Sequence, residues 1–166
     1  MNRTHSIDLL NTAVADELQA VHQYMYFHFH LSDDGFEPLA ALFKRTAIEE
    51  MGHVETLAER ILFLKGDVIM APAGPVDAIT DPEAMLKKGM EMEQASVASY
   101  NKAAIECDAH EDAVSKQLFE RLVGDEERHF DQYEKQRDHI RRFGPNYLAL
   151  QSFGRSAPQA ERGGAE

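Results

Sequence analysis

The sequence predicts an all-α fold, a four-helix bundle of two antiparallel hairpins joined by a long crossover and followed by a short fifth helix. Three observations predict it. Apolar residues recur at helical spacing in four long stretches, and one long irregular segment divides these stretches into two pairs. The second pair also repeats the first, because matching residues recur at a single offset (93 − 17 = 126 − 50 = 129 − 53 = 76). We therefore expect a duplicated helical hairpin.

The first hairpin is expected to contain helices over about residues 6–31 and 38–64. Its apolar residues recur at intervals of three and four, and the polar residues 32–35 indicate the turn between the two helices. Pro38 is favourable in the first turn of a helix. Gly66 is a C-terminal stop signal, so we expect it to end the second helix.

Residues 67–80 contain two prolines and a glycine, and they are expected to form the crossover. Fourteen extended residues reach roughly 46–50 Å, about the length of a 30-residue helix. The segment is therefore long enough to run from one end of the bundle to the other.

The second hairpin is expected to contain helices over about residues 82–107 and 111–142. Asp81 precedes a proline and is expected to cap the first of these helices. A short polar turn at residues 108–110 separates them, and Gly144, which also precedes a proline, is expected to end the second.

The C-terminal segment is expected to divide into a helix and a tail. Residues 146–153 predict a short fifth helix, whereas residues 154–166 are small and polar and predict disorder. With 166 residues and 43% hydrophobic content, the chain can bury one sizeable core. We therefore expect one domain over residues 1–153.

Composition excludes several classes of partner. A formal net charge of −12 argues against a nucleic-acid partner, because proteins that bind nucleic acid normally have a clustered basic face. The negative charge would attract cations, although an ordinary acidic surface would carry the same charge. The single cysteine, Cys107, can form neither an internal disulfide nor a tetrathiolate zinc site. No long apolar segment indicates a membrane span or a signal peptide. By elimination, we expect a cytoplasmic protein.

Two Glu-x-x-His pairs, Glu50/His53 and Glu126/His129, are the strongest functional signal. Residues three apart share one face of a helix, so each pair offers a carboxylate and an imidazole to a single point. A lone glutamate precedes each pair at the same interval (50 − 17 = 126 − 93 = 33). The pattern predicts a dinuclear metal site, and its predicted ligands are Glu17, Glu50, His53, Glu93, Glu126 and His129.

Hairpin geometry brings these ligands to one level. Glu17 lies about 21 Å above the first predicted turn and Glu50 about 18 Å above it, and the second hairpin is level within about one residue's rise. Four glutamates would then meet in the middle of the bundle, where two divalent ions relieve the repulsion between buried carboxylates. An isolated Glu-x-x-His pair occurs readily by chance, and surface salt bridging is the alternative for any single glutamate.

The predicted ligand set also favours particular metals. Oxygen-rich ligation with one imidazole per ion suits iron or manganese better than copper, and the lack of cysteine argues against structural zinc. Tyr24 and Tyr100 obey the same 76-residue repeat and face the same way as the lone glutamates. We expect them to donate hydrogen bonds to ligating carboxylates across the bundle. Ordinary core tyrosines would show the same spacing.

Four short segments carry a resemblance to a known family: Asp16-Glu17-Leu18 with Ala20 and Gln23-Tyr24, Glu49-Glu50-Met51-Gly52-His53, Glu59-Arg60-Ile61-Leu62-Phe63-Leu64, and Asp125-Glu126-Glu127-Arg128-His129. Through them the chain resembles the bacterioferritins, ferritin-like bundles, over about residues 5–153. The resemblance implies that the six predicted ligands form a di-iron ferroxidase centre that oxidises Fe(II). It implies that Glu50 and Glu93 bridge the ions, with Glu17 and His53 on one iron and Glu126 and His129 on the other.

The resemblance further implies an assembly and a second cofactor. The family forms hollow cages of 24 subunits, built from dimers, that store a ferric mineral made with O2 or H2O2 and release it with an electron-donor protein. Met51 matches the methionine that binds haem b at a two-fold subunit interface, although a lone helical methionine is ordinarily a packing residue. Arg45 stands where some members have a histidine for iron on the inner surface, so that site is not expected here.

Two other functions remain open. A di-iron peroxidase, or another ferritin-like redox protein without iron storage, would use the same six ligands, but such relatives usually carry a cysteine-rich iron domain that this chain lacks. A non-enzymatic helical interaction module would use the acidic faces alone. Measurements of iron oxidation and iron retention would distinguish these two functions from iron storage. The sequence assigns no role to His22, His28 and His30.

Overall fold

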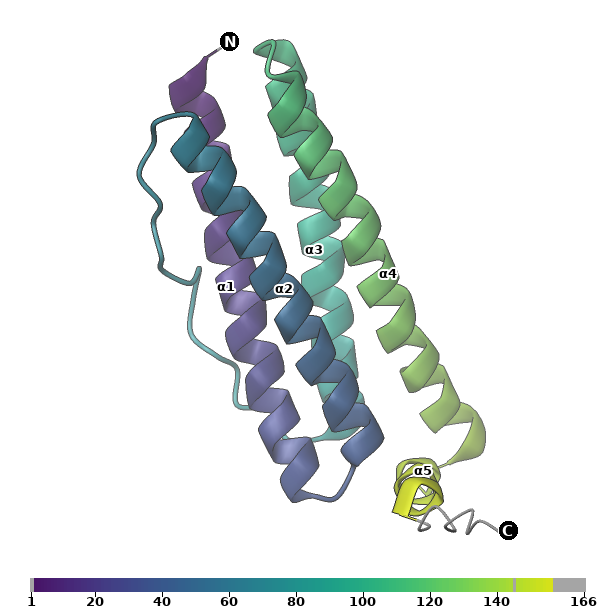
Figure 1. The fold of residues 1–166 in the computed structure, drawn as a ribbon. Coiled ribbons are helices and arrows are strands. Elements are labelled where there is room, and N and C mark those ends of the chain that lie inside the picture. The colour runs from purple at the N-terminus through teal and green to yellow at the C-terminus, as the bar shows by residue number, and fades with distance from the viewer. Residues whose placement is uncertain (1, 145, 157–166) are drawn as a thin grey trace, which may run out of the picture.

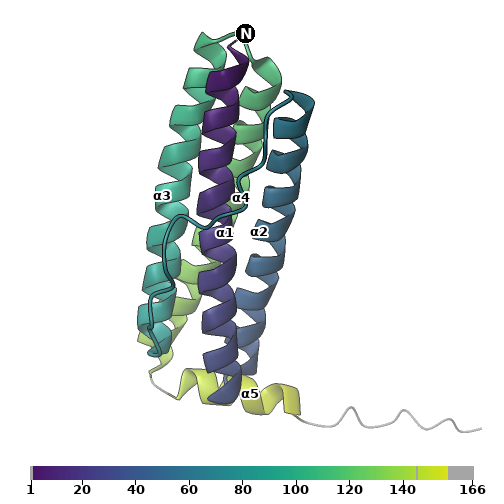
Figure 2. The ribbon, with the colours of Figure 1, turned by 90° about the vertical axis from the view of Figure 1, so that its left-hand side faces the viewer.

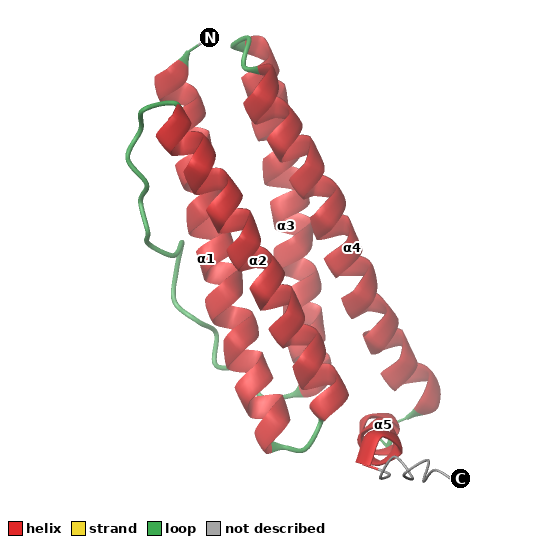
Figure 3. Cartoon of the chain, viewed as in Figure 1, coloured by secondary structure: helices red, strands yellow, loops and turns green. Residues whose placement is uncertain are grey.

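The computed structural model describes residues 2–144 and 146–156, whose helices form a four-helix bundle with a fifth helix across one end (Figure 1). These residues contain helices and no strands, as Figure 3 shows. α1 lies antiparallel to α2 and α3 antiparallel to α4, which confirms the two expected hairpins. The helices are α1 (Arg3–Asp33), α2 (Glu37–Phe63), α3 (Pro82–Ala109), α4 (Ala113–Phe143) and α5 (Tyr147–Ser156).

Aspartate side chains begin both helices of the second hairpin. Asp81 accepts a hydrogen bond of 2.8 Å from the backbone N–H of Ala84, which confirms the predicted cap of α3. Asp112 accepts one of 3.2 Å from the N–H of Ser115 at the start of α4. At the other end of α4, Gly144 has a φ of 82°, a conformation that glycine adopts without steric cost.

The end of α2 differs from the expectation for Gly66. The residue with the left-handed conformation is Lys65, with a φ of 67°, and the N–H of Gly66 bonds to the carbonyl of Ile61 at 3.0 Å. Gly66 is needed for space instead. A Cβ atom there would lie 2.8 Å from the side chain of Ile7 on α1, so the glycine allows α1 to pass close to the end of α2.

The crossover runs along the bundle beside α1, from the end of α2 to the start of α3 (Figure 2). This confirms the end-to-end connection. Three side-chain amides of α1 bind the backbone of the crossover. Each of them donates one hydrogen bond to a crossover carbonyl and accepts one from a crossover N–H. They are Asn11 with the O of Asp67 and the N of Ile69, Gln19 with the O of Pro75 and the N of Gly74, and Gln23 with the O and N of Asp77.

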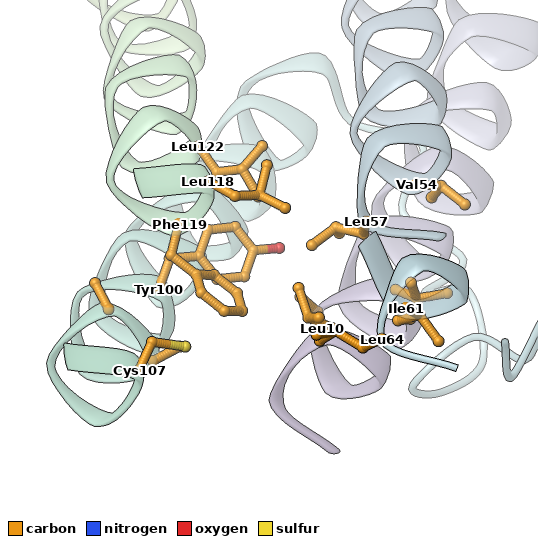
Figure 4. Close-up of a cluster of buried hydrophobic side chains, with 14 of the residues drawn as sticks. Leu10, Val54, Leu57, Ile61, Leu64, Tyr100, Cys107, Leu118, Phe119 and Leu122 are labelled. Atoms are coloured by element: carbon orange, nitrogen blue, oxygen red, sulfur yellow. The ribbon is translucent and has the colours of Figure 1, made fainter. Parts of the chain in front are cut away.

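The buried apolar side chains form two clusters, one toward each end of the bundle. The cluster near the N-terminus of α1 includes Leu10, Leu57 and Phe119, and Figure 4 shows it closing the space between the two hairpins. The cluster toward α5 includes Phe27 and Phe43. On α2, α3 and α4, the buried residues between the two clusters are polar, and on α1 the buried Glu17 lies among the last residues of the first cluster. The metal ligands predicted from the sequence therefore occupy a polar layer between the two apolar clusters.

α5 lies across the end of the bundle and adds Leu148 to the neighbouring apolar cluster. It continues through Ser156, so residues 154–156, which were expected to belong to the tail, are helical. A single glycine weakens a helix by about 1 kcal/mol without necessarily ending it. The remainder of the expected tail lies outside the described residues. In the described part of the chain, no helix combines the length and the apolar character that crossing a membrane requires.

Candidate metal centre

The polar layer brings together all six side chains that the sequence selected as ligands. α1 and α3 each supply one glutamate, and α2 and α4 each supply a glutamate and a histidine one turn apart. All six are buried, and His53, with 9% of its surface exposed, is the most accessible of them. The centre therefore lies inside one protomer and needs no second chain to complete its ligand set.

The ligand atoms form two overlapping groups, and within each group they lie within 4.8 Å of one another. One group contains Glu17 and His53, and the other contains Glu93 and His129. Glu50 and Glu126 belong to both. This is the arrangement of two neighbouring cation positions that share two carboxylates.

The shared pair differs from the expectation that Glu50 and Glu93 bridge. Glu126, not Glu93, takes part in both groups. The internal repeat gives the physical reason, because residues 50 and 126 are equivalent under the 76-residue offset, as are residues 17 and 93. A site with two equivalent halves must share equivalent residues, so each lone glutamate serves a single half.

Both histidines direct Nδ1 into the carboxylates. The Nδ1 atom of His53 lies 2.8 Å from Glu50 and 3.3 Å from both Glu17 and Glu126. The Nδ1 atom of His129 lies 3.0 Å from Glu50 and 3.2 Å from Glu126. The two rings are nearly parallel, at an interplanar angle of 28° with centroids 6.0 Å apart.

Several of these atoms lack a hydrogen-bond partner of suitable geometry. They are both carboxylate oxygens of Glu50, one of Glu126 and the Nδ1 atom of His53. A buried polar atom without a partner costs about 1–3 kcal/mol, and more when it is charged. Cations at the two positions would meet these lone pairs directly. The donor set of four carboxylates and two imidazoles therefore fits two hard or borderline divalent ions.

The protonation of the cluster reflects crowding of like charges. Burial raises the pKa of Glu17 and of Glu93 well above the ordinary value, and repulsion from neighbouring carboxylates adds to it. Burial alone would lower the pKa of His129, but hydrogen bonds to Glu126 and Glu50 outweigh it and raise this pKa to about 10. The metal-free cluster therefore holds protons that compete with cations.

Two tyrosines hold the lone glutamates from the opposite hairpin. The hydroxyl of Tyr24 on α1 donates to Glu93 on α3 at 2.5 Å. The hydroxyl of Tyr100 on α3 donates to Glu17 on α1 at 2.8 Å. These are the hydrogen bonds expected from the repeat, and their reciprocity follows the same 76-residue offset.

A third buried tyrosine, Tyr133, was not selected from the sequence. Its ring stacks on Phe43 with centroids 4.9 Å apart and meets Tyr24 edge-on at 5.6 Å. Tyr133 lies four residues after His129, so it shares the ligand face of α4. That spacing could have identified it.

Met51 lies outside the buried site, on the outer side of α2. It is 44% exposed and lines an open, largely apolar hollow of about 700 Å³. Met25 and Ile48 line the same hollow, and Met70 of the crossover reaches it. The hollow is apolar and wide enough for a flat hydrophobic group.

His22, His28 and His30 lie outside the metal centre. His22 is exposed, and His28 places Nδ1 3.0 Å from the carbonyl oxygen of Ala40, which ties α1 to α2. His30 packs against Tyr26. These contacts involve none of the six predicted ligands.

Comparison with known proteins identifies the family of this chain. Residues 7–143 match the Ferritin family model, a ferritin-like domain. The chain is 37% identical over 143 residues to the bacterioferritin of Desulfovibrio desulfuricans, an alignment that covers 86% of this chain and 80% of the relative. It is 37% identical over 145 residues to the bacterioferritin of Rhodobacter capsulatus, covering 87% and 89%. The chain therefore belongs to the ferritin-like family, and within it to the bacterioferritins.

Solved structures agree with this assignment. The D. desulfuricans bacterioferritin, described with its diiron site in different catalytic states, superposes with a TM-score of 0.88 at 34% identity and covers 98% of this chain and 96% of that one. The R. capsulatus bacterioferritin has a metal-free dinuclear site and haem iron in a crystallographic special position. It superposes with a TM-score of 0.85 at 34% identity, covering 89% and 92%.

Proposed function

We propose that this protein stores iron by oxidising Fe(II) to Fe(III) at the six-residue centre and depositing the product as a mineral inside a hollow assembly. The observation that carries the proposal is the convergence of four buried glutamates and two buried histidines into two groups that share Glu50 and Glu126. Family membership and the diiron site of the D. desulfuricans relative support iron as the metal.

In this proposal each Fe(II) ion has its own pair of ligands. Glu17 and His53 hold one ion, Glu93 and His129 hold the other, and the two shared carboxylates lie between them. Two Fe(II) ions supply two electrons, which reduce O2 with two protons to H2O2, or H2O2 with two protons to water. The four carboxylates stabilise the extra positive charge of the Fe(III) product.

The surrounding residues keep the ligands in place. Tyr24 and Tyr100 each donate a hydrogen bond to one oxygen of a lone glutamate, which fixes the orientation of that carboxylate. The apolar clusters on both sides limit access of water to the layer. The ligands therefore need little rearrangement when Fe(II) arrives, and positioning is the main contribution of the protein.

We infer that the storage assembly is the 24-subunit cage of the family, built from dimers. The chain carries a formal charge of −12, so 24 copies carry −288 (24 × −12) at pH 7, which attracts Fe(II). Release of stored iron requires reduction of Fe(III), which calls for an electron-donor protein. A cytoplasmic location fits the single buried cysteine, Cys107.

We also infer that the hollow beside Met51 is half of a haem b site at a two-fold subunit interface, with one Met51 from each subunit on the haem iron. The exposed, apolar lining supports it, as does the haem iron of the R. capsulatus relative. Haem-replete expression should give a Soret band that Met51→Leu removes. Met25→Leu, in the same hollow, is the matched control and should keep it. A Soret band that is unchanged in Met51→Leu would refute ligation of the haem iron by this methionine.

Iron titration tests the storage proposal. Fast oxidation should saturate at about two Fe(II) per subunit, the capacity of a dinuclear carboxylate site. Glu50→Ala combined with His129→Ala should abolish it, whereas Glu127→Gln, an exposed neighbour of the site, should not. Unchanged oxidation in the double variant would remove the proposal. Sustained peroxide turnover without retained iron would indicate the peroxidase instead.

A further inference from the structure

Both ligand histidines also have an outer face. The Nε2 atom of His129 lies 2.9 Å from the carboxylate of Glu49, and the Nε2 atom of His53 lies 3.6 Å from that of Asp125. Each contact joins α2 to α4, because the acidic residue of one helix meets the histidine of the other. The outer nitrogens therefore face carboxylates that are not among the six ligands.

Glu49 and Asp125 are a repeated pair, since they are related by the 76-residue offset (125 − 49 = 76). Each directly precedes the glutamate of a Glu-x-x-His motif. Each half of the repeat thus contains three metal ligands and one additional acidic residue, Glu49 or Asp125. An ordinary surface ion pair would have no reason to follow the symmetry of the metal centre.

A single arginine joins the two outer carboxylates. The Nη1 atom of Arg128 lies 2.8 Å from Glu49, and its Nη2 atom lies 3.0 Å from Asp125. The residue equivalent to Arg128 in the first half is Gly52 (128 − 52 = 76), so one guanidinium serves both halves. Its planar fork can hold two carboxylates at once, which a lysine cannot do with the same geometry.

We propose that Glu49, Asp125 and Arg128 form an outer clamp that positions His53 and His129 for metal binding. Glu49 accepts the Nε2 proton of His129, and Asp125 attracts the Nε2 proton of His53 from 3.6 Å, so that the Nδ1 lone pair of each ring faces the ions. Arg128 keeps both carboxylates against the histidine rings. The three are positioning residues, and this inference rests on the proposed metal function of the centre.

The clamp makes the two halves unequal. His129 is fully buried and its outer nitrogen is within hydrogen-bond distance of Glu49, whereas His53 is more exposed and Asp125 lies farther from it. The half that contains His129 is therefore the more firmly prepared. We expect it to fill first when metal is added gradually.

Co(II) binding to the assembled protein tests the clamp without iron oxidation. The visible absorption bands of bound Co(II) report metal binding at the two sites and do not depend on any activity. Glu49→Gln and Asp125→Asn should each lower Co(II) affinity about 10–100-fold, the usual effect of removing a carboxylate behind a histidine ligand. Glu127→Gln removes the same charge from an exposed neighbour without a histidine contact, so it measures the effect of charge alone.

Arg128 variants give the sharpest contrast. Removing a positive charge beside a cation site should raise Co(II) affinity if charge alone matters, but Arg128→Gln should lower it if the clamp positions the histidines. Arg128→Lys keeps the charge and should also lower it, because the two-carboxylate fork is lost. Thermal unfolding of the metal-free variants should be little changed, since these ion pairs are half exposed.

The outcomes separate this inference from the function on which it rests. If the unmodified protein fails to bind two Co(II) per subunit, the metal centre itself is wrong. If it binds two and Arg128→Gln binds them as tightly or more tightly, the clamp is overturned while the centre stands. Weaker binding in all three clamp positions, with Glu127→Gln close to the unmodified protein, supports it.

Discussion

Tyr24 and Glu93 lie 69 residues apart in the sequence, yet the hydroxyl of one donates to the carboxylate of the other at 2.5 Å and joins the two hairpins at the metal layer. Both side chains are buried. Tyr24→Phe should lower the free energy of unfolding of the metal-free protein by about 1–3 kcal/mol, because Glu93 loses a buried donor. It should also weaken Co(II) binding to the His129 half.

Chemical denaturation with chelator present measures the first effect, and Co(II) titration measures the second. Tyr26→Phe on the same helix is the control, because Tyr26 packs against Phe27 and His30 and is only half buried. Equal stabilities of the two variants would show that the hydroxyl of Tyr24 contributes nothing to the fold.

Arg60 on α2 and Asp112 at the start of α4 form a nearly buried ion pair, with 2.5 Å between Nη2 and Oδ1. Asp112→Ala should destabilise the fold by about 3 kcal/mol or more, because it leaves the Arg60 charge without its partner. Asp108→Ala, in an exposed pair with Lys116, should cost less than about 1 kcal/mol. Similar losses in the two variants would contradict the importance of burial here.

The same pair predicts a pH dependence. Burial raises the pKa of Asp112, but its polar contacts, among them the hydrogen bond from Ser115 and the charge of Arg60, outweigh this and leave the pKa below its ordinary value. A lowered folded pKa gives stability that is fully present above the unfolded pKa of about 3.9 and is lost as pH falls through the folded value.

Thermal unfolding from pH 6 to pH 2.5 checks this dependence. The difference in melting temperature between the unmodified protein and Asp112→Asn should be constant above about pH 5 and shrink below about pH 4. Asp108→Asn serves as the exposed comparison. A difference that grows as the pH falls would reverse the predicted sign.

Gly89 on α3 makes room for the aromatic stack beside the metal layer. A Cβ atom there would lie 2.9 Å from the ring of Tyr133. Gly89→Ala should therefore destabilise the protein by about 1–3 kcal/mol through overpacking. Gly124→Ala, on α4 with nothing within 4 Å of the new atom, should instead stabilise it by about 0.5–1 kcal/mol. Unfolding free energies of the two variants should move in opposite directions.

Divalent metal should stabilise the folded protein because the ligand set exists only in the fold. At a free Zn(II) concentration 100 times the dissociation constant, each site should contribute about 2.7 kcal/mol, and chelator should reverse the effect. Glu50→Gln should lose most of this gain, since Glu50 belongs to both groups. Glu55→Gln, exposed on the same helix, should retain it. Equal stabilisation of the two variants would place the metal elsewhere.

Much of the fold followed from the sequence because helical periodicity and the 76-residue repeat are local, countable patterns. The level of the six ligands could be predicted from helix rise alone, because both hairpins place them at similar distances from their turns. The helix caps at Asp81 and Gly144 also follow from local chemistry. These features depend on neighbours in the chain rather than on distant contacts.

The features that sequence reasoning missed depend on contacts between helices. The role of Gly66 is set by the approach of Ile7, which no local pattern reveals. The shared position of Glu126 could have been found, because the repeat requires equivalent residues to occupy the middle of the site. Arg128 could not, because its partner Glu49 lies on another helix and the first half of the repeat has a glycine in its place.

Anomalous diffraction from crystals loaded with Fe(II) would locate the iron ions relative to the six side chains. We predict two iron peaks in every subunit, one beside Glu17 and His53 and one beside Glu93 and His129, with Glu50 and Glu126 reaching both. Iron bound only at the surface, or the six side chains left without two ions between them, would show that these residues do not form a dinuclear iron site.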